Sequence, residues 1–445
     1  MTWRTGTAAI AALALIPAGT TAAQALHLHR AAASVTTEAV LTGTHAVAVQ
    51  PGRISYSKGG PNSEGWTRFE VFTRTTSITA GKLVLGPEQK LLSDTQYAAL
   101  SGSAGWLQYG GNQLRDSAGV ITELPGLGSA PPQASGNRIM LRGRQFVGSP
   151  PTNWSWPTRI DLQTMTYTGR PEVAALFGNH MIHAAGNNNE AIVVADVVRN
   201  VRAVHYSGTT RIVAVAISGK WLAWVTGCPS TEPCAQTLTI RDTAAKTQRT
   251  IATKGTTSLK LSGGYLAFDA KPGTQRELRT IKHGTSTQLA AGTLPASPNV
   301  GRPVDARDVT PDQFDLDDET LVWTDKDLAF KAVQLAPFIN APVYLGAAFA
   351  PSSMTTSWTL KLPVSKALPT CQVTIYRGTA KVRVFNCANT DGMVIETWNG
   401  KTSTGATLPK GTYTYRVTGQ DADKYNLRNY DGTLTAVGGS ITKTA

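Results

Sequence analysis

The sequence predicts an all-β chain: a six- or seven-bladed β-propeller followed by an immunoglobulin-like β-sandwich. A short phrase centred on glycine recurs along the first two thirds of the chain, at Gly136, Gly178, Gly219 and Gly263, which are 42, 41 and 44 residues apart. The 42 glycines and 24 prolines punctuate a chain rich in Thr and Val, which favours many short strands. After Val333 the phrase stops and a different alternating pattern begins.

Residues 1–25 have the features of a secretory signal peptide. A single positive charge at Arg4 precedes an apolar run over 8–16, helix-breaking Pro and Gly, and a small-x-small cleavage site. The apolar run is about half of the roughly 20 residues that span a bilayer. We therefore expect a cleaved peptide, no membrane span and a secreted protein.

The four cysteines fit export. Cys228 and Cys234 flank a short loop, and Cys371 and Cys387 lie together in a later region, so the economical pairing is 228–234 and 371–387. A zinc site is the alternative, but neither pair has the gap of two to four residues that zinc knuckles use. We expect two disulfides and an oxidising compartment.

The recurring phrase predicts two strands joined by a tight turn. Its clearest copies read Ser-Gly-Lys-Trp-Leu-Ala-Trp and Ser-Gly-Gly-Tyr-Leu-Ala-Phe, and all copies lie at 135–141, 177–182, 218–224 and 262–268, with weaker ones at 42–47, 104–109 and 317–323. A unit of four short strands about every 40 to 45 residues is typical of propeller blades, which assigns residues 35–335 to the propeller. The phrase at 218–224 and Leu-Thr-Ile-Arg-Asp-Thr at 238–243 resemble propellers of the TolB-like and WD40-like class. This resemblance implies a fold and no function.

A second pattern in the copies is a strand that ends in Asp, at Asp116, Asp161, Asp196 and Asp242. An Asp side chain accepts hydrogen bonds from backbone N–H groups two residues on, and so starts a turn. We therefore expect turn residues at these positions and not a catalytic set.

The blade with the clearest pattern, at 212–252, indicates which connections lie at each end of the propeller. We expect its strands at 212–217, 221–225, 238–241 and 248–252, which places the turns at 218–219 and 242–246 at one end. The connections between second and third strands then share the opposite end, and they vary in length: 50–65, 143–157, 186–190, 227–234 and 271–274. Variable loops on a rigid scaffold usually carry binding, so this end is the candidate site.

The loop 143–157 supplies the candidate ligand-binding residues. Trp154 and Trp156 stand at i and i+2, close to Arg142 and Arg144. Indole rings stack on sugars or fill a partner's pocket. The alternative is that both indoles pack on the neighbouring blade.

The C-terminal region is expected to begin after a linker at 336–342 and to cover 343–445. Its alternating strands over about 100 residues predict an immunoglobulin-like sandwich. The stretch 397–415 resembles the FlgD-type immunoglobulin-like domain, at Trp398, Gly400, Gly405, Pro409, Gly411, Thr412 and Tyr413. Asn399 departs from the Asp usual in that family, and Cys371 and Cys387 are additions to its pattern. The resemblance implies an accessory, non-catalytic module, in which Trp398 fills the core and the glycines form turns.

The acidic and histidine clusters do not predict a metal site. Seven acids crowd the segment 305–319: Asp305, Asp308, Asp312, Asp315, Asp317, Asp318 and Glu319. Such a run suits Ca²⁺, but the blade pattern separates 305–312 from 317–319 by the length of a strand, so a solvated run is expected. His180 and His183, three apart in a predicted strand, point to opposite faces, and zinc is not expected there. No metal and no cofactor are predicted.

The charge indicates the kind of partner. Lys and Arg number 42 against 29 Asp and Glu, a net charge of +13, yet no basic run or nucleic-acid motif is present. A diffuse positive charge favours anionic cell-wall polymers, acidic glycans or acidic extracellular proteins, and no nucleic acid. Standard catalytic spacings such as Gly-x-Ser-x-Gly and His-Glu-x-x-His are missing.

The sequence as a whole predicts a secreted, non-catalytic binding or scaffolding protein whose propeller loops recognise a cell-envelope or extracellular ligand. The alternative is a propeller enzyme, such as a polysaccharide lyase or a metal-assisted hydrolase, with an accessory module. A structural role in an extracellular assembly is the third possibility.

Overall fold

The computed structural model of the chain is all-β over the residues that it describes. These are residues 44–445 except 62–66, 80–81, 96–99, 104–105, 110–112, 117–118, 120, 124–132, 136–137, 142–145, 149–159, 162–172, 187, 197–200, 229–234, 286, 297–312, 319, 336–340, 346–349, 391 and 430–432. Residues 35–445 form one compact unit. Within the described residues no helix is present that could span a bilayer.

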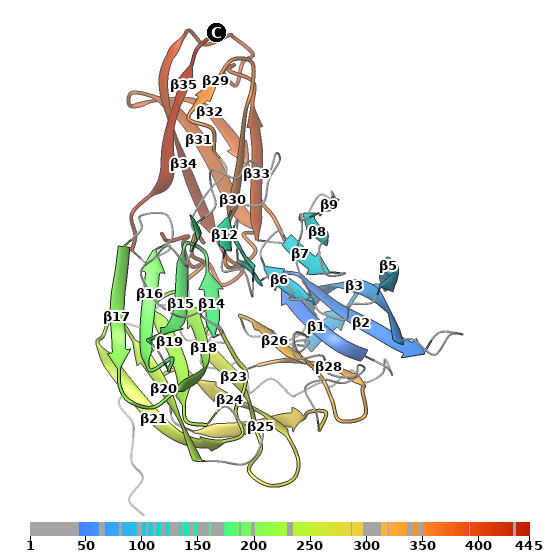
Figure 1. Cartoon of the computed structure of the whole chain (residues 1–445). Coiled ribbons are helices and arrows are strands. Elements are labelled where there is room, and N and C mark those ends of the chain that lie inside the picture. The colour runs from blue at the N-terminus through green and yellow to red at the C-terminus, as the bar shows by residue number, and fades with distance from the viewer. Residues whose placement is uncertain are drawn as a thin grey trace, which may run out of the picture. The chain divides into compact units, whose positions relative to one another are not determined.

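The first part of the chain forms a succession of small antiparallel sheets (Figure 1). Within the described residues there are seven, each built from strands adjacent in sequence. The first three are β1 (Thr44–Gln50), β2 (Arg53–Pro61), β3 (Thr67–Thr79), β4 (Lys82–Leu85) and β5 (Gln89–Thr95); β6 (Ser101–Ser103), β7 (Trp106–Tyr109), β8 (Gln113–Asp116) and β9 (Ile121–Glu123); and β10 (Gln133–Ser135), β11 (Arg138–Leu141), β12 (Phe146–Gly148) and β13 (Ile160–Asp161).

Four further sheets follow. They are β14 (Ala174–Phe177), β15 (His180–Ala185), β16 (Ala191–Asp196) and β17 (Val201–Ser207); β18 (Ile212–Ser218), β19 (Trp221–Thr226), β20 (Ala235–Asp242) and β21 (Thr247–Lys254); β22 (Leu259–Ser262), β23 (Tyr265–Ala270), β24 (Glu277–Lys282) and β25 (Gln288–Thr293); and β26 (Phe314–Asp317), β27 (Thr320–Thr324) and β28 (Phe330–Gln334). The strands predicted for the clearest blade are β18 to β21.

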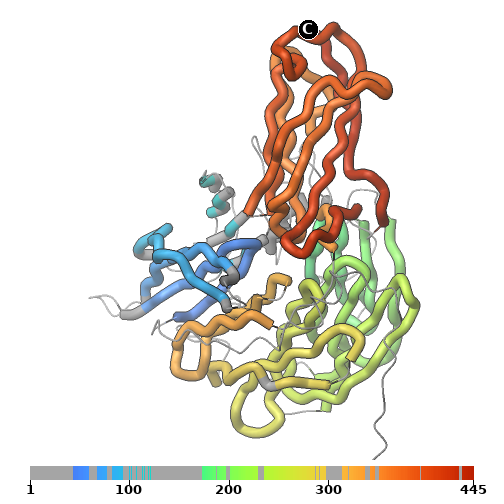
Figure 2. Tube along the Cα trace, turned by 180° about the vertical axis from the view of Figure 1, so that it is seen from behind, coloured from blue at the N-terminus to red at the C-terminus, as the bar shows by residue number. Residues whose placement is uncertain are grey.

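The seven sheets close into a ring. The first strand of each sheet contacts the first strand of the next, and β26 of the last sheet contacts β1 of the first. Figures 1 and 2 both draw blue β1 and β2 beside the orange strands β26 to β28. Across this closure Val47, Ile54 and Tyr56 share a core with Val322 and Phe330. A closed ring of four-stranded units is the β-propeller arrangement that the sequence predicts.

The two faces of β18 show how neighbouring sheets stack. In β18 Ala214 and Ala216 pack toward the β22 sheet, whereas Val215 and Ile217 pack toward the β14 sheet. Because successive side chains of a strand point to opposite faces, one strand of alternating apolar residues supplies two separate cores. The indole of Trp224, only 1% exposed, is the largest side chain in one of these cores.

The turn between the first and second strands has the same backbone geometry in four sheets. Gly178, Gly219 and Gly263 have φ between 52° and 55°, and the corresponding residue of the last sheet, Asp318, has φ 52°. This left-handed conformation favours Gly, and Asp is one of the few other residues that tolerate it. The recurring glycine of the sequence is therefore the left-handed residue of a tight hairpin turn.

Three details of the predicted blades are wrong. In the copy at 42–47, the described residues from Thr44 onward belong to β1, which is the first strand of its sheet and not the second, and the turn between the first two strands follows at 51–52. The predicted loop 50–65 contains strand β2, and the predicted loop 143–157 contains strand β12. The hairpin at Gly52 has φ 69°, so the turn glycine exists but lies later in the chain than the phrase indicates.

The last 100 residues form two sheets around one core. One sheet has the order β29 (Ser353–Met354), β35 (Val437–Lys443), β34 (Gly411–Gln420), β31 (Thr370–Arg377) and β32 (Ala380–Asn386); the other pairs β30 (Trp358–Pro363) with β33 (Met393–Trp398). Trp358 and Trp398 are almost fully buried between them. The core position expected for Trp398 is confirmed, and Gly400 and Gly405 have positive φ, as expected of turn residues, whereas Gly411 begins the strand β34.

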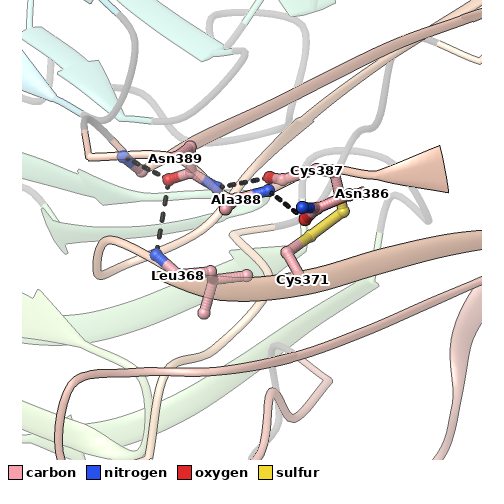
Figure 3. Close-up of a disulfide and its surroundings, with 7 residues drawn as sticks. Leu368, Cys371, Asn386, Cys387, Ala388 and Asn389 are labelled. Carbon is pink, nitrogen blue, oxygen red and sulfur yellow. Dashed lines mark hydrogen bonds between the residues drawn. A yellow bond between two sulfur atoms is a disulfide. The ribbon is translucent and has the colours of Figure 1, made fainter.

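Two local features lie on the five-stranded sheet. The Tyr413 hydroxyl donates to the Pro409 carbonyl, 2.6 Å away and four residues upstream, a hydrogen bond of the same kind as the tyrosine corner of immunoglobulin-type sandwiches. Cys371 and Cys387 form the predicted disulfide beside β31 (Figure 3). Figure 3 also shows Asn389, whose side chain accepts a hydrogen bond from the Leu368 N–H at 3.4 Å. Cys228 is disulfide-bonded too, and its predicted partner Cys234 lies outside the described residues.

Candidate functional site

The antiparallel order gives the ring two distinct ends. We call "loop face" the end where second strands lead to third strands and each sheet leads to the next; its described segments are 186–190 without 187, 208–211, 227–228, 255–258, 271–276 and 325–329. We call "turn face" the opposite end, which has the tight turns at 178–179, 219–220, 243–246, 263–264 and 318. The predicted division of turns and loops is confirmed for the β18 sheet, where Thr243 N donates to the Lys220 carbonyl at 2.9 Å.

A buried ion pair organises the loop face. Asp269, fully buried at the end of β23, accepts from Arg276 Nη2 at 2.8 Å. The same carboxylate accepts the N–H groups of Thr257 and Ser258, each at 2.8 Å. Arg276 Nη1 continues to the Gln313 side chain at 2.7 Å, at the start of the last sheet. The buried pair, with its hydrogen bonds to Thr257, Ser258 and Gln313, therefore holds the segments 255–258 and 271–276 and the start of the last sheet in fixed positions relative to one another.

Glutamine side chains make a second set of hydrogen bonds to the backbone of the loop face, and these recur in two sheets. Gln236, at the start of β20, donates to the carbonyl of Thr256 at 3.1 Å and accepts the Thr256 N–H at 2.7 Å. It also donates to the Cys228 carbonyl at 3.0 Å. In the following sheet Gln275 donates to the Leu294 carbonyl at 3.1 Å. Each Gln therefore ties a loop to the segment that leaves the same sheet, and the loop backbone is held in place.

The described residues of the loop face carry a basic group. Lys254 ends β21 and Lys271 follows β23, and their backbones are joined by a hydrogen bond from Lys271 N to the Lys254 carbonyl at 2.7 Å. Arg211, which precedes β18, is exposed, as is Lys254. The sequence predicts that Lys271 lies in a variable loop, but it does not predict that these cations lie near one another. Arg211 and Lys271 are 60 positions apart, and only the closed ring brings both to the loop face.

The turn face is approached by the C-terminal part of the chain. A Cβ added to Gly178 would lie 1.7 Å from the Leu345 carbonyl oxygen, and one added to Gly52 would lie 2.3 Å from the Thr390 carbonyl oxygen. Lys366 Nζ lies 3.0 Å from the Asp318 carboxylate. Turns of three different sheets thus contact the C-terminal residues, which leaves the loop face as the end of the ring on which a ligand is to be sought.

The acids that the sequence predicts as a solvated run are enclosed where the structure describes them, so that prediction is wrong for them. Asp315 lies 3.5 Å from Lys260 Nζ. Burial raises the pKa of Asp317 well above its usual range, and the neighbouring carboxylates Asp318 and Asp315 add to the rise. The reason is that 314–317 is a strand between two sheets and not a loop. Asp305, Asp308, Asp312 and Glu319 lie outside the described residues.

Asp242 has the expected role of starting a turn. Its Oδ1 accepts the N–H groups of Ala244 and Ala245, both at 2.9 Å, and its Oδ2 pairs with Lys220 Nζ at 2.7 Å. These partners outweigh the cost of partial burial and lower the pKa of the Asp242 carboxyl.

The histidines occupy packed positions. His180 and His183 both lie in β15, and burial lowers the pKa of His183. His283 packs against Trp221 with ring centroids 4.4 Å apart and the ring planes tilted by 40°. Burial, with Lys220 nearby, lowers the pKa of His283 to about 4. Among the described residues, no group of three or more His, Cys, Asp and Glu side chains is placed to hold a metal ion.

All four predicted ligand-binding residues lie outside the described residues, so they stay a prediction. Their flanking strands are described: Arg142 and Arg144 fall between β11 and β12, whereas Trp154 and Trp156 fall between β12 and β13. The two pairs therefore belong to different connections of the sheet, the first of the loop-face type and the second of the turn-face type, and the prediction of one shared loop is wrong.

Comparison with known proteins gives weak likenesses. No protein-family model matches the chain, and no curated protein matches it. A chain of the mitotic checkpoint complex has a TM-score of 0.41 and 13% identity, over 74% of this chain and 99% of that chain. PorZ, a surface component of the type-IX secretion system of Porphyromonas gingivalis, has 0.34 and 12%, over 89% and 59%. BamB from Moraxella catarrhalis has 0.32 and 11%, over 68% and 100%. Likenesses of this strength carry no argument about function, and the sheet order itself establishes the fold.

Proposed function

We propose that the protein is a secreted, non-catalytic binding or scaffolding protein that uses the loop face of its propeller to recognise a cell-envelope or extracellular ligand. The observation that carries the proposal is the network around Asp269 and Arg276, which holds loop backbones in a fixed arrangement before any ligand arrives. Preorganised loops bind without the entropic cost of ordering them.

A local group of positive charges on the loop face indicates the sign of the ligand. Arg211, Lys254 and Lys271 contribute positive charge at the junction of the β14, β18 and β22 sheets. Long-range attraction then favours an anionic cell-wall polymer, an acidic glycan or an acidic extracellular protein, and it weakens as salt screens it. Arg142 and Arg144, in the connection between second and third strands of their sheet, would add to the same face.

Export is part of the proposal. The disulfide Cys371–Cys387 supports an oxidising compartment, because such bonds persist outside the reducing cytosol. The signal peptide expected at 1–25 lies outside the described residues. The hydrogen bond of Tyr413, of the tyrosine-corner kind, supports an immunoglobulin-like accessory module of the FlgD type at 343–445, behind a linker at 336–342.

A pull-down of the mature protein against cell-envelope fractions, at low and high salt, tests the proposal. The Lys254→Glu/Lys271→Glu variant should lose capture of the envelope component at low salt. The matched control is Lys246→Glu/Lys410→Glu, which makes the same charge change at an exposed turn-face lysine and an exposed C-terminal lysine. Equal capture by both double variants would overturn the loop-face assignment.

A second comparison separates the predicted residues. Arg142→Ala/Arg144→Ala should weaken capture, because their connection joins a second strand to a third, as the loop-face connections do. Trp154 and Trp156 belong to a connection between a third and a fourth strand, as at the turn face, so Trp154→Ala/Trp156→Ala should leave capture unchanged. Loss of capture in the Trp variant alone would overturn the loop-face assignment.

A further inference from the structure

A second surface with its own chemistry lies on the C-terminal sheet β29-β35-β34-β31-β32. Along β34, Tyr413, Tyr415 and Val417 point into the core, so the alternate residues Thr412, Thr414, Arg416 and Thr418 are exposed on the other side. In β31, Cys371, Val373 and Ile375 are likewise buried in the core, which turns the alternate residues to the other side. There Thr370 and Gln372 are exposed, Tyr376 is partly exposed and Thr374 is buried. We call this exposed side the "outer sheet face".

The strand register places the key groups of this face side by side. Tyr376 is directly opposite Thr414 on one neighbouring strand and Lys381 on the other. Arg416, opposite Thr374, is diagonal to Tyr376. Directly opposite residues have Cβ atoms about 5 Å apart, and diagonal ones about 7 to 8 Å, within reach of long side chains. On the far side of Arg416 stands Gly438, which has no side chain to cover the guanidinium.

The charge of this sheet has one sign. The strands β31, β32, β34 and β35 contain Arg377, Lys381, Arg383, Arg416 and Lys443 and neither Asp nor Glu. Arg383 donates to the Thr402 carbonyl, and Lys443 is buried. Arg377, Lys381 and Arg416 are exposed and form no ion pair with any described residue. Cations left uncompensated on one face attract an anionic partner.

The polar and aromatic side chains of the outer sheet face indicate the chemical class of the partner. Its rows of Thr, Ser, Gln and Asn side chains offer hydroxyls and amides that exchange hydrogen bonds with sugar hydroxyls. The Tyr376 ring supplies an amphipathic aromatic surface beside the cations. Val384, 44% exposed, is the one large apolar side chain that stands out on these strands among the described residues, too little for insertion into a lipid surface.

We propose that the outer sheet face binds an acidic polysaccharide. The sugar rings lie on Tyr376 and the hydroxyl rows, while Arg416 and Lys381 hold the carboxylates of the chain. This surface is separate from the loop face and does not depend on the ligand proposed there. It makes the C-terminal domain a second point of attachment outside the cell.

The test is a binding titration of the mature full-length chain with polygalacturonate, with neutral dextran as the uncharged comparison. Lys381→Ala/Arg416→Ala should weaken polygalacturonate binding by about tenfold or more, because two charge-assisted hydrogen bonds are removed. Tyr376→Ala should weaken it as well. Lys381 and Arg416 are exposed, so the thermal unfolding temperature of their double variant should stay unchanged. Binding to dextran should be weak for every variant.

Two controls make the result decisive. Lys401→Ala/Lys410→Ala removes the same number of charges from the segment between β33 and β34, and Lys254→Glu/Lys271→Glu alters the loop face; both should bind polygalacturonate as the parent does. Equal loss in the Lys401/Lys410 variant would reduce the effect to net charge and overturn the proposal. Absence of polygalacturonate binding would overturn it too, as would single-stranded DNA binding of equal strength that responds to the same variants.

Discussion

The backbone N–H of Val49 donates to Asp315 Oδ2 at 2.9 Å, across 266 residues of sequence. Val49 belongs to the first strand of the ring and Asp315 to the first strand of the last sheet, so this hydrogen bond lies on the line where the ring closes. Asp315 also faces Lys260 of the preceding sheet at 3.5 Å. One carboxylate therefore links three successive sheets, and the acid that looked solvated in the sequence is a closure residue.

Removing this carboxylate should open the closure. We expect Asp315→Ala to lower the free energy of unfolding by about 1 to 3 kcal/mol, because the buried Val49 N–H loses its acceptor. Asp315→Asn keeps an acceptor oxygen and should cost less. Urea unfolding measures both, with the exposed Asp327→Ala as the control that should behave as the parent. A loss no greater in Asp315→Ala than in Asp327→Ala would contradict the closure role.

The loop-face ion pair should be far more costly to break than a surface pair. Arg276→Met leaves the Asp269 carboxylate buried without its cation, and we expect a loss of about 3 to 5 kcal/mol. The matched control is Arg279→Met, whose partner Glu277 is 30% exposed, with an expected loss below about 1 kcal/mol. Adding Asp269→Asn to Arg276→Met should recover part of the stability, and urea unfolding with hydrogen exchange at Thr257 and Ser258 measures all three.

Two turn glycines offer a test of the contact at the turn face. Gly178 and Gly219 have the same φ of 55°, so replacement by Ala strains both backbones by about 1 kcal/mol. A Cβ at residue 219 would meet nothing within 4 Å, whereas one at residue 178 would collide with the Leu345 carbonyl. Gly178→Ala should therefore lower the unfolding temperature clearly more than Gly219→Ala. Equal shifts would show that residue 345 does not lie against this turn.

His283 should make stability depend on pH. Its pKa is about 4 in the folded chain and near 6.5 when unfolded, because burial disfavours the charged ring. Above pH 6.5 both states are neutral and the group has no effect. As the pH falls from 6.5 to 4 the unfolded chain takes up the proton first, so the free energy of unfolding drops by up to about 3 kcal/mol.

His283→Phe keeps an aromatic ring against Trp221 and cannot titrate. Its unfolding free energy, measured by urea titration at several pH values, should fall less steeply over this range. His183, whose pKa is also lowered, accounts for part of the slope that remains. Parallel profiles for the parent and His283→Phe would contradict the assignment.

The disulfide Cys371–Cys387 should stabilise the C-terminal sheets because the loop that it closes lowers the conformational entropy of the unfolded chain. With a sequence separation of 16 residues, its removal in Cys371→Ala/Cys387→Ala should cost about 3 kcal/mol. Calorimetry of the two variants checks this, with Cys228→Ala/Cys234→Ala expected to lose less because its closed loop is shorter. The larger loss in the second variant would mean that loop length does not govern the effect.

Local sequence patterns predict most turns and strands correctly, but they do not predict the first sheet or the short strand β12. The turn glycines at 178, 219 and 263 were found because φ near 55° leaves a residue-specific trace in the sequence. The first sheet was misplaced because its turn, at Gly52, lacks the apolar phrase that follows the other glycines. The loop 143–157 was predicted as one connection because a three-residue strand such as β12 is too short to leave a periodic signal.

The sequence by itself determined the all-β class, the repeat with its left-handed turns, the disulfide of the C-terminal region and the core position of Trp398, because each depends on residues close together along the chain. Only the tertiary structure decided that the ring closes through Asp315, that Asp269 and Arg276 organise the loop face, and that Tyr376, Lys381 and Arg416 stand together on one sheet. Strand pairing and sheet stacking bring the side chains of these contacts together. Local sequence preferences do not specify which distant residue a carboxylate or a guanidinium will contact.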